Sequence, residues 1–210
     1  MSPPPPAPPP AGKDEGRRKA SGFPYWLDVQ TRWSDNDQYG HVNNAMYYHA
    51  ADAAINDLLV SHCSLQPYRQ PTDPPLADPS LDCLGLMIST SAIYFAPATF
   101  PCLLRVGLRV IKIGSSSVLF ELGMFELPSP SKGRSLPFQA AQGAEGDASI
   151  NPPPRLDPNA LAGTLTRATH VYVDRATRRP LKPMPKPISD GLRSVYVKEW
   201  SEDSKDKPKL

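Results

Sequence analysis

The sequence predicts a single α+β domain in which one long helix packs against about five strands. Three observations predict it. Apolar residues recur at helical spacing over one segment of about 20 residues, and several other segments have the pattern of strands. Of the 27 prolines, all but Pro24, Pro97 and Pro101 fall into four clusters outside these segments. A chain of 210 residues also has the length of one domain.

The first strand is predicted over residues 25–33, where apolar and polar residues alternate. After a loop over 34–41, Asn43 or Asn44 is a suitable N-cap for the helix. The helix is expected to end near Cys63. Its apolar residues are Tyr47, Tyr48, Ala51, Ala54, Ile55, Leu58 and Leu59. A helix this apolar is expected to be largely enclosed by other structure.

Further strands are predicted over 85–95, 102–113, 117–127 and 164–173, with Gly114 and Ser115 in a hairpin turn. The domain is expected to span residues 22–195. Residues 1–21 and 196–210 are predicted to be a disordered Pro-rich tail and a charged tail, because neither has enough large apolar side chains to offset the entropy of ordering. Residues 129–160, rich in Pro, Gly, Ser and Ala, are predicted to be a flexible insertion.

Composition excludes several classes of function. The net charge of +2 gives no broad field for a polyanion, so no nucleic-acid partner is expected. No segment has the roughly 20 apolar residues that cross a bilayer, so membrane insertion is not expected either. The three cysteines have neither a disulfide nor a metal spacing. We therefore expect no metal and a location inside the cell, first the cytoplasm, with mitochondrion and peroxisome left open.

The segment SDNDQYGHVNNAMYYHAADAAINDLL, residues 34–59, is the most informative one. It places Asp35, Asp37 and His41 directly ahead of the helix start. The first amides of a helix lack intrahelical partners and lie at the positive end of its dipole, so a thioester carbonyl placed there would find an oxyanion site. Asp37 would be the reactive acid. For Asp35 we expect the simpler task of holding the loop.

The same segment resembles the signature of the hotdog-fold acyl-CoA thioesterases, in the 4-hydroxybenzoyl-CoA thioesterase-like branch. The runs ISTSAIYFAPATF, LRVGLRVIKIGSSSVLFELGMFE and THVYVD are also similar to that branch, so the resemblance covers about residues 25–127 and 163–192. It implies an antiparallel sheet wrapped around a central helix. It also implies a homodimer or a dimer of dimers, with acyl-CoA sites between subunits.

The resemblance implies roles for particular residues. Asp37 matches the catalytic acid, which attacks the thioester or activates water. The amide near Asn44 matches the group that binds the carbonyl oxygen, Gly40 matches the small residue at the turn, and Tyr47 matches an aromatic residue of the acyl pocket. The implied reaction is hydrolysis of an acyl-CoA to a free acid and coenzyme A, with no cofactor.

Other residues have two open interpretations. His41 has the chemistry of a general acid or substrate donor, or it fixes the loop through hydrogen bonds. Asn43 caps the helix and could also contact substrate. Arg105, Arg109 and Lys112, with Ser115, Ser116 and Ser117, could hold the phosphates of coenzyme A, or they form a solvated strand face and a polar turn.

Two other functions are compatible with a hotdog fold. A hotdog hydratase needs Asn two places and His five places after its Asp, but counting from Asp35 these places hold Asp37 and Gly40. The hydratase interpretation therefore fails. A noncatalytic acyl-CoA-binding or assembly module with the same fold stays open, because one acid without its geometry does not make an active site.

Overall fold

The computed structural model describes residues 15–70, 72–128 and 156–198. The strands are β1 (Tyr25–Gln30), β2 (Cys83–Tyr94), β3 (Cys102–Ile113), β4 (Ser117–Pro128) and β5 (Thr164–Asp174). The helices are α1 (Glu15–Arg18), α2 (Asn44–Cys63) and α3 (Lys186–Ser194), with 3-10 turns η1 (Ala20–Gly22), η2 (Trp33–Asp35) and η3 (Pro79–Leu81). The predicted insertion lies almost wholly outside the described residues.

The five strands form one antiparallel sheet in the order β1-β3-β4-β5-β2. This confirms the predicted α+β class and the predicted strands, most of them to within two residues. The first strand is shorter than expected, because the Thr31 hydroxyl turns to donate to the Cys102 carbonyl at 2.7 Å and the chain then enters η2. β1 and β2 form the two edges of the sheet.

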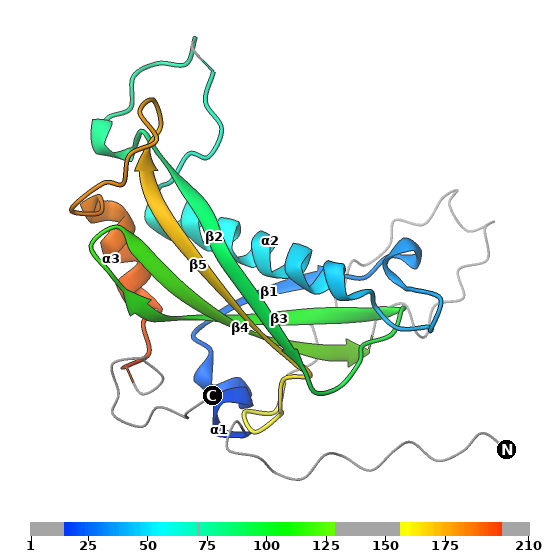
Figure 1. The fold of residues 1–210 in the computed structure, drawn as a ribbon. Coiled ribbons are helices and arrows are strands. Elements are labelled where there is room, and N and C mark those ends of the chain that lie inside the picture. Colours follow the sequence, from blue (N-terminus) through cyan, green and yellow to red (C-terminus); the bar gives the residue numbers. More distant parts are fainter. Residues whose placement is uncertain (1–14, 71, 129–155, 199–210) are drawn as a thin grey trace, which may run out of the picture.

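Helix α2 lies along one face of the twisted sheet (Figure 1). Its predicted apolar residues are buried, except that Tyr48 is half-buried. Asn43 is the N-cap, and its side chain accepts the amide of Ala45 at 2.9 Å. The helix ends at Cys63, where Ser64 takes a left-handed conformation with φ 55°. The main core therefore lies between α2 and the inner face of the sheet.

The N-terminal segment 15–23 packs on the outer face of the sheet, opposite α2, and here the predicted disorder is wrong. Phe23 is buried over Gly107 and Gly123, where a Cβ on Gly123 would lie 2.5 Å from the ring. Disorder was predicted because residues 1–21 contain too few large apolar side chains to offset the entropy of ordering. The segment is instead held by polar contacts of two arginines. Arg17 forms an ion pair with Glu121 of β4, and Arg18 donates a hydrogen bond to the Ala162 carbonyl, just before β5, at 2.9 Å.

Helix α3 was not predicted from the sequence, because its start lies among four prolines, at residues 180, 183, 185 and 187, that were assigned to a C-terminal strap. It packs against the end of α2 (Figure 1). Gly191 makes the close approach possible, since a Cβ there would lie 2.5 Å from the Cys63 sulfur. Ile188 and Leu192 of α3 are fully buried in the main core.

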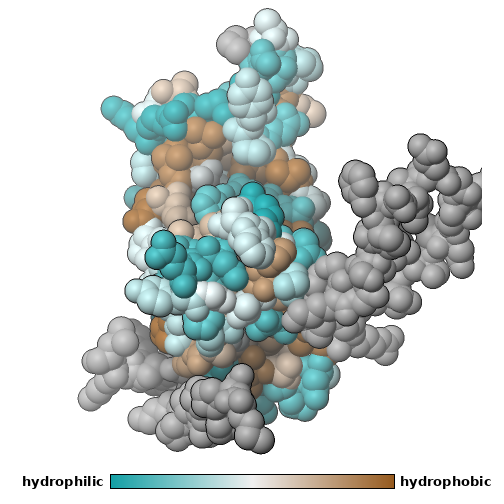
Figure 2. Space-filling view, turned by 90° about the vertical axis from the view of Figure 1, so that its right-hand side faces the viewer, coloured by the Kyte–Doolittle hydropathy of each residue, from teal (hydrophilic) through white to brown (hydrophobic). Residues whose placement is uncertain are grey.

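The surface of the described part is mixed in character. Figure 2 shows apolar patches lying among hydrophilic side chains on the side of the molecule at the right of Figure 1. Edge strand β2 contributes the exposed large apolar residues Leu86, Met87, Ile88, Ile93 and Tyr94. No helix within the described ranges is long and apolar enough to span a membrane.

Candidate active site

A pocket of about 440 Å³ opens where the loop before α2 meets the segment that follows β2. Its wall combines acid, amide and aromatic groups from three parts of the chain. They are Asp37, Tyr39, His41 and Val42 of the loop, Asn44 and Tyr47 of α2, and Tyr94, Phe95, Ala96 and Pro97 at and after the end of β2. The pocket thus brings together four residues predicted from the sequence: Asp37, His41, Asn44 and Tyr47.

The carboxylate of Asp37 is fixed through one of its two oxygens. Oδ1 accepts the amide of Tyr39 at 2.8 Å and the amide of His41 at 3.3 Å. Within the described part of the chain, Oδ2 has no hydrogen-bond partner. Asp37 is only half-buried, and the residue lines the pocket. This geometry orients an acid while leaving one oxygen for chemistry.

The first residue of α2, Asn44, lines the same pocket. Asn43 uses its side chain to cap the amide of Ala45, which leaves Asn44 as the first helical residue. The amide of a first helical residue has no intrahelical acceptor, and it lies at the positive end of the helix dipole. Asn44 lines the pocket, whereas Asn43 shapes it through the cap.

Two tyrosines form the aromatic side of the pocket. The ring centroids of Tyr47 and Tyr94 lie 5.4 Å apart in an edge-on arrangement. The Tyr47 hydroxyl accepts the amide of Ala98 at 3.0 Å, and the Tyr94 hydroxyl donates to the Asn44 carbonyl at 3.4 Å. Burial raises the pKa of Tyr47, and burial followed by the Tyr48 hydroxyl raises the pKa of Tyr94 to about 12. Both phenols are therefore neutral at physiological pH.

Asp35 holds the loop, as predicted. Its buried carboxylate accepts the amide of Arg32 at 2.8 Å and the Arg32 guanidinium at 3.0 Å. Its carbonyl accepts the amide of Asn43 at 2.8 Å, which ties the loop to the N-cap. Asp35 lines a separate hollow beside the loop and is absent from the lining of the Asp37 pocket.

Gly40 and His41 close the turn around Asp37. Gly40 has φ +81°, a conformation that L side chains rarely adopt, and its amide donates to the Asp37 carbonyl at 3.2 Å. His41 is exposed and lines the pocket. Gly40 therefore acts through the backbone, while His41 has a side chain within the wall.

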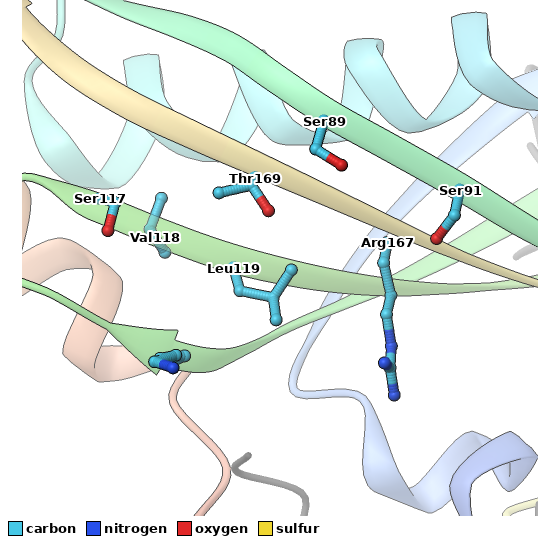
Figure 3. Close-up of a pocket in the computed structure, with 8 residues that line it drawn as sticks. Ser89, Ser91, Ser117, Val118, Leu119, Arg167 and Thr169 are labelled. Carbon is cyan, nitrogen blue, oxygen red and sulfur yellow. The ribbon is translucent and has the colours of Figure 1, made fainter. Parts of the chain in front are cut away.

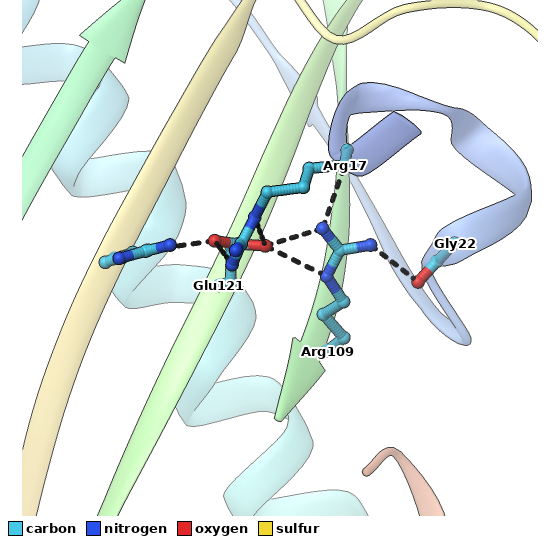
Figure 4. Close-up of polar contacts among 5 residues, drawn as sticks. Arg17, Gly22, Arg109 and Glu121 are labelled. Carbon is cyan, nitrogen blue, oxygen red and sulfur yellow. Dashed lines mark hydrogen bonds and ion pairs between the residues drawn. The ribbon is translucent and has the colours of Figure 1, made fainter. Parts of the chain in front are cut away.

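The residues predicted to hold the phosphates of coenzyme A are not gathered in the Asp37 pocket. Ser117 and Lys112 line a second hollow on the outer face of the sheet (Figure 3), and Ser116 is buried in the turn. Arg109 is fully buried (Figure 4). Its guanidinium bonds to Glu121 at 2.5 Å and to the carbonyls of Gly22 and Arg17. The structure thus gives Arg109 an internal, structural position.

Glu121 lies at the centre of that network. Burial alone would raise the pKa of this carboxyl, but the charges of Arg109 and Arg17 outweigh it and hold the pKa below its usual value. Arg167 donates to the same carboxylate at 2.9 Å. Three guanidinium groups therefore converge on one buried carboxylate (Figure 4).

Sequence reasoning did not assign Tyr39, Phe95, Ala96 and Pro97 to the site. Tyr39 is 87% exposed and looks like an ordinary loop residue. The other three follow β2, far from the loop in sequence, and only the sheet topology brings them together. The isolated proline in the run YFAPATF could have indicated that a strand ends there and a turn follows, because proline is disfavoured inside a sheet.

Comparisons with known proteins agree with this geometry. The model of the thioesterase superfamily matches residues 39–129, which include every residue lining the Asp37 pocket except Asp37 itself. A search of curated protein sequences finds no significant match. Among solved structures, the chain is similar to the PA5185 protein of Pseudomonas aeruginosa strain PAO1, with 29% identity and a TM-score of 0.63 over 86% of this chain and 96% of that one.

Two more distant structures share the fold. One is Slr0204, a 1,4-dihydroxy-2-naphthoyl-CoA thioesterase from Synechocystis, with 15% identity and a TM-score of 0.53 over 80% of this chain and 95% of that one. The other is a thioesterase from Thermus thermophilus complexed with coenzyme A and Zn, with 18% identity and a TM-score of 0.52 over 83% of this chain and 95% of that one.

The five-stranded antiparallel sheet with α2 along one face is the hotdog fold, which the similar solved structures share. The chain is thus similar to the thioesterase superfamily over residues 39–129.

Proposed function

We propose that the chain hydrolyses an acyl-CoA to a free acid and coenzyme A, with Asp37 as nucleophile or general base and the Asn44 amide as oxyanion donor. The observation that supports this most is the anchored carboxylate of Asp37, a residue that shares one pocket with Asn44, the first residue of α2. The thioesterases among the similar structures act on or bind coenzyme A compounds, which supports the choice of acyl-CoA.

Asp37 can act in two ways that give the same products. As nucleophile, Oδ2 attacks the thioester carbon, the carbon–sulfur bond breaks, and coenzyme A leaves as a thiolate. Water then hydrolyses the resulting mixed anhydride and regenerates the carboxylate. As general base, the carboxylate instead takes a proton from the water that attacks the thioester directly.

The Asn44 amide would stabilise the negative charge that develops on the carbonyl oxygen, because it is a fixed donor at a helix start. Tyr47, Tyr94 and Phe95 would contact the acyl group along the aromatic side of the pocket. His41, at the pocket rim, would donate to substrate, while Gly40 and Asn43 would keep the backbone of the turn and cap in place.

The proposal includes a symmetric homodimer, or a dimer of such dimers, formed along β2. This edge strand has 12 residues, and it exposes several apolar side chains, with Ile88 64% and Ile93 54% accessible. Long apolar edge strands are usually covered or paired. An intracellular location also belongs to the proposal, because Cys63, Cys83 and Cys102 are all free and buried.

Release of free thiol from a panel of aliphatic and aromatic acyl-CoAs tests the function. We expect turnover of at least one thioester by the parent and a fall of at least about 10²-fold for Asp37→Asn, which keeps the shape of the side chain and removes its charge. Parent protein that binds acyl-CoA but releases no thiol would establish a binding module and refute the enzyme.

Sedimentation at micromolar concentration tests the assembly. We expect a dimer or tetramer that the charge substitution Ile88→Lys shifts toward monomer, while the substitution Val60→Lys on the exposed face of α2 serves as the control. A parent protein that is monomeric and fully active would refute the shared edge.

A further inference from the structure

A second hollow, of about 350 Å³, lies on the outer face of the sheet, on the side away from α2 (Figure 3). Its lining is rich in hydroxyl groups and cations from four neighbouring strands. The residues are Ser89 and Ser91 of β2, Lys112 of β3, Ser117, Val118 and Leu119 of β4, and Arg167 and Thr169 of β5. Of the residues that line this hollow, only Lys112 and Ser117 were considered above as contacts for coenzyme A.

The strand register explains why these side chains meet. Ser89 pairs with Thr169 and Ser91 pairs with Arg167 across β2 and β5, so the four residues form two adjacent rows on one face. Figure 3 shows the hydroxyl groups of Ser89 and Thr169 near each other, and that of Ser91 farther along the same face of the sheet, beside Arg167. Within the described part of the chain, none of the three hydroxyls has a hydrogen-bond partner.

Arg167 gives the hollow its charge. Its Nε donates to Glu121 at 2.9 Å, and among the described residues its two terminal nitrogens have no partner. Glu121 also receives Arg109 and Arg17, both at 2.5 Å, so its negative charge is shared among three cations. The side chain of Arg167 is 38% exposed, in contrast to fully buried Arg109. A guanidinium held in place with open donors is a suitable anchor for a phosphate group.

We propose that this outer hollow binds a phosphate-bearing small molecule, with phosphate held by the terminal nitrogens of Arg167 and the hydroxyl of Ser91, and with the hydroxyls of Ser89 and Thr169 contacting the rest of the ligand. The positive charge of Lys112, which also lines the hollow, likewise favours an anionic ligand. The volume lies at the lower end of the range for small-molecule sites, so it admits more than a single phosphate.

Two sources could supply this phosphate: the nucleotide part of a coenzyme A thioester, or a separate phosphorylated ligand. The Asp37 pocket is lined by entirely different residues from the outer hollow. The site is therefore testable without reference to hydrolysis, and the experiment below distinguishes the two sources.

Calorimetric titration of the full chain with inorganic pyrophosphate tests the site, with Ser91→Asp as the main variant. A carboxylate at this position faces Arg167 across the strand pair and would compete for its open donors. Ser91→Asn is the matched control, because it adds a side chain of the same size without charge. Arg167→Gln is a second variant, since Glu121 retains two other cations and the fold should persist.

We expect pyrophosphate binding by the parent, a rise of at least about tenfold in Kd for Ser91→Asp and Arg167→Gln, and a smaller change for Ser91→Asn. Absence of binding by the parent, or equal Kd values for the folded charge variants and the parent, would overturn the proposal. If both charge variants also raise the KM for an acyl-CoA, the phosphate belongs to the substrate. If KM is unchanged while pyrophosphate binding is lost, the hollow serves a separate ligand.

Discussion

Two hydrogen bonds join Asp37 and His41. The amide of Asp37 donates to the His41 carbonyl at 2.8 Å, and the amide of His41 donates to the Asp37 carboxylate at 3.3 Å. The intervening turn is thereby closed at both ends, and the carboxylate direction is set by the backbone rather than by side-chain packing. A carboxylate positioned in this way should tolerate changes in the neighbouring side chains but not in the turn itself.

Loss of charge should affect stability at Asp35 and hydrolysis at Asp37. Asp35→Asn should lower the free energy of unfolding by about 1–3 kcal/mol, because a buried carboxylate loses its charge-assisted bonds to Arg32. Asp37→Asn should change stability by less than about 0.5 kcal/mol while hydrolysis falls. Urea denaturation and thiol release on the same samples measure both effects. Equal profiles for the two variants would contradict the separate roles.

Gly40→Ala should distort the turn without any steric clash. No atom lies within 4 Å of the added Cβ, so the cost comes from φ +81° alone and should be about 1–2 kcal/mol. Gly40→Asn should cost less, because Asn adopts this conformation more readily. Thermal denaturation gives the order Gly, Asn, Ala. A Gly40→Ala protein as stable and active as the parent would show that the turn can adopt another backbone.

Gly123→Ala should destabilise the protein through Phe23. The new Cβ would lie 2.5 Å from that ring, and such overpacking costs about 1–3 kcal/mol. In a Phe23→Ala background the same substitution should cost much less, because the clashing ring is gone. Chemical denaturation of the two single variants and the double variant gives the coupling. Additive effects would show that Phe23 does not occupy its position over Gly123 in solution.

His170 should make stability decrease as the pH falls below the ordinary His pKa of about 6.5. Burial lowers its pKa, an effect opposed by the Asp52 carboxylate, and both ring nitrogens lack a partner within the described structure. The residues that it pairs with on the adjacent strands, Met87 and Val118, and the nearby Phe120 and Gly85 do not titrate. On acidification the unfolded chain takes up the proton first, so the free energy of unfolding should fall below the ordinary His pKa.

Urea denaturation of the parent and of His170→Gln at several pH values measures this dependence. The variant should lose less stability than the parent on acidification, because it has no imidazole to protonate. Parallel pH profiles for the two proteins would show that another group is responsible.

Most of the fold could be predicted from the sequence, because the strands and α2 have strong local patterns. β3 was predicted at its observed bounds, and the end of α2 at Cys63 was also correct. Helix α3 was missed because prolines at its start resemble a strap, although proline is favourable in the first turn of a helix. The packing of residues 15–21 was missed because it depends on ion pairs with distant Glu121.

The site was predictable only where its residues are close in sequence. Asp37, His41, Asn44 and Tyr47 lie within one segment, and the structure gathers them in one pocket. Arg109 was considered for phosphate binding because it lies on the polar side of its strand. The sequence could not show that Glu121 pairs with it across the sheet, since that depends on the strand register.

The aromatic wall of the Asp37 pocket begins where β2 ends. Tyr94 is the last residue of that strand, and Phe95, Ala96 and Pro97 continue from it without a break. A subunit paired along β2 would therefore restrain one wall of the pocket in which hydrolysis is proposed. Ligand binding and subunit association are then thermodynamically linked. If association raises the affinity of the pocket for a ligand by some factor, binding of that ligand raises the association constant of the subunits by the same factor.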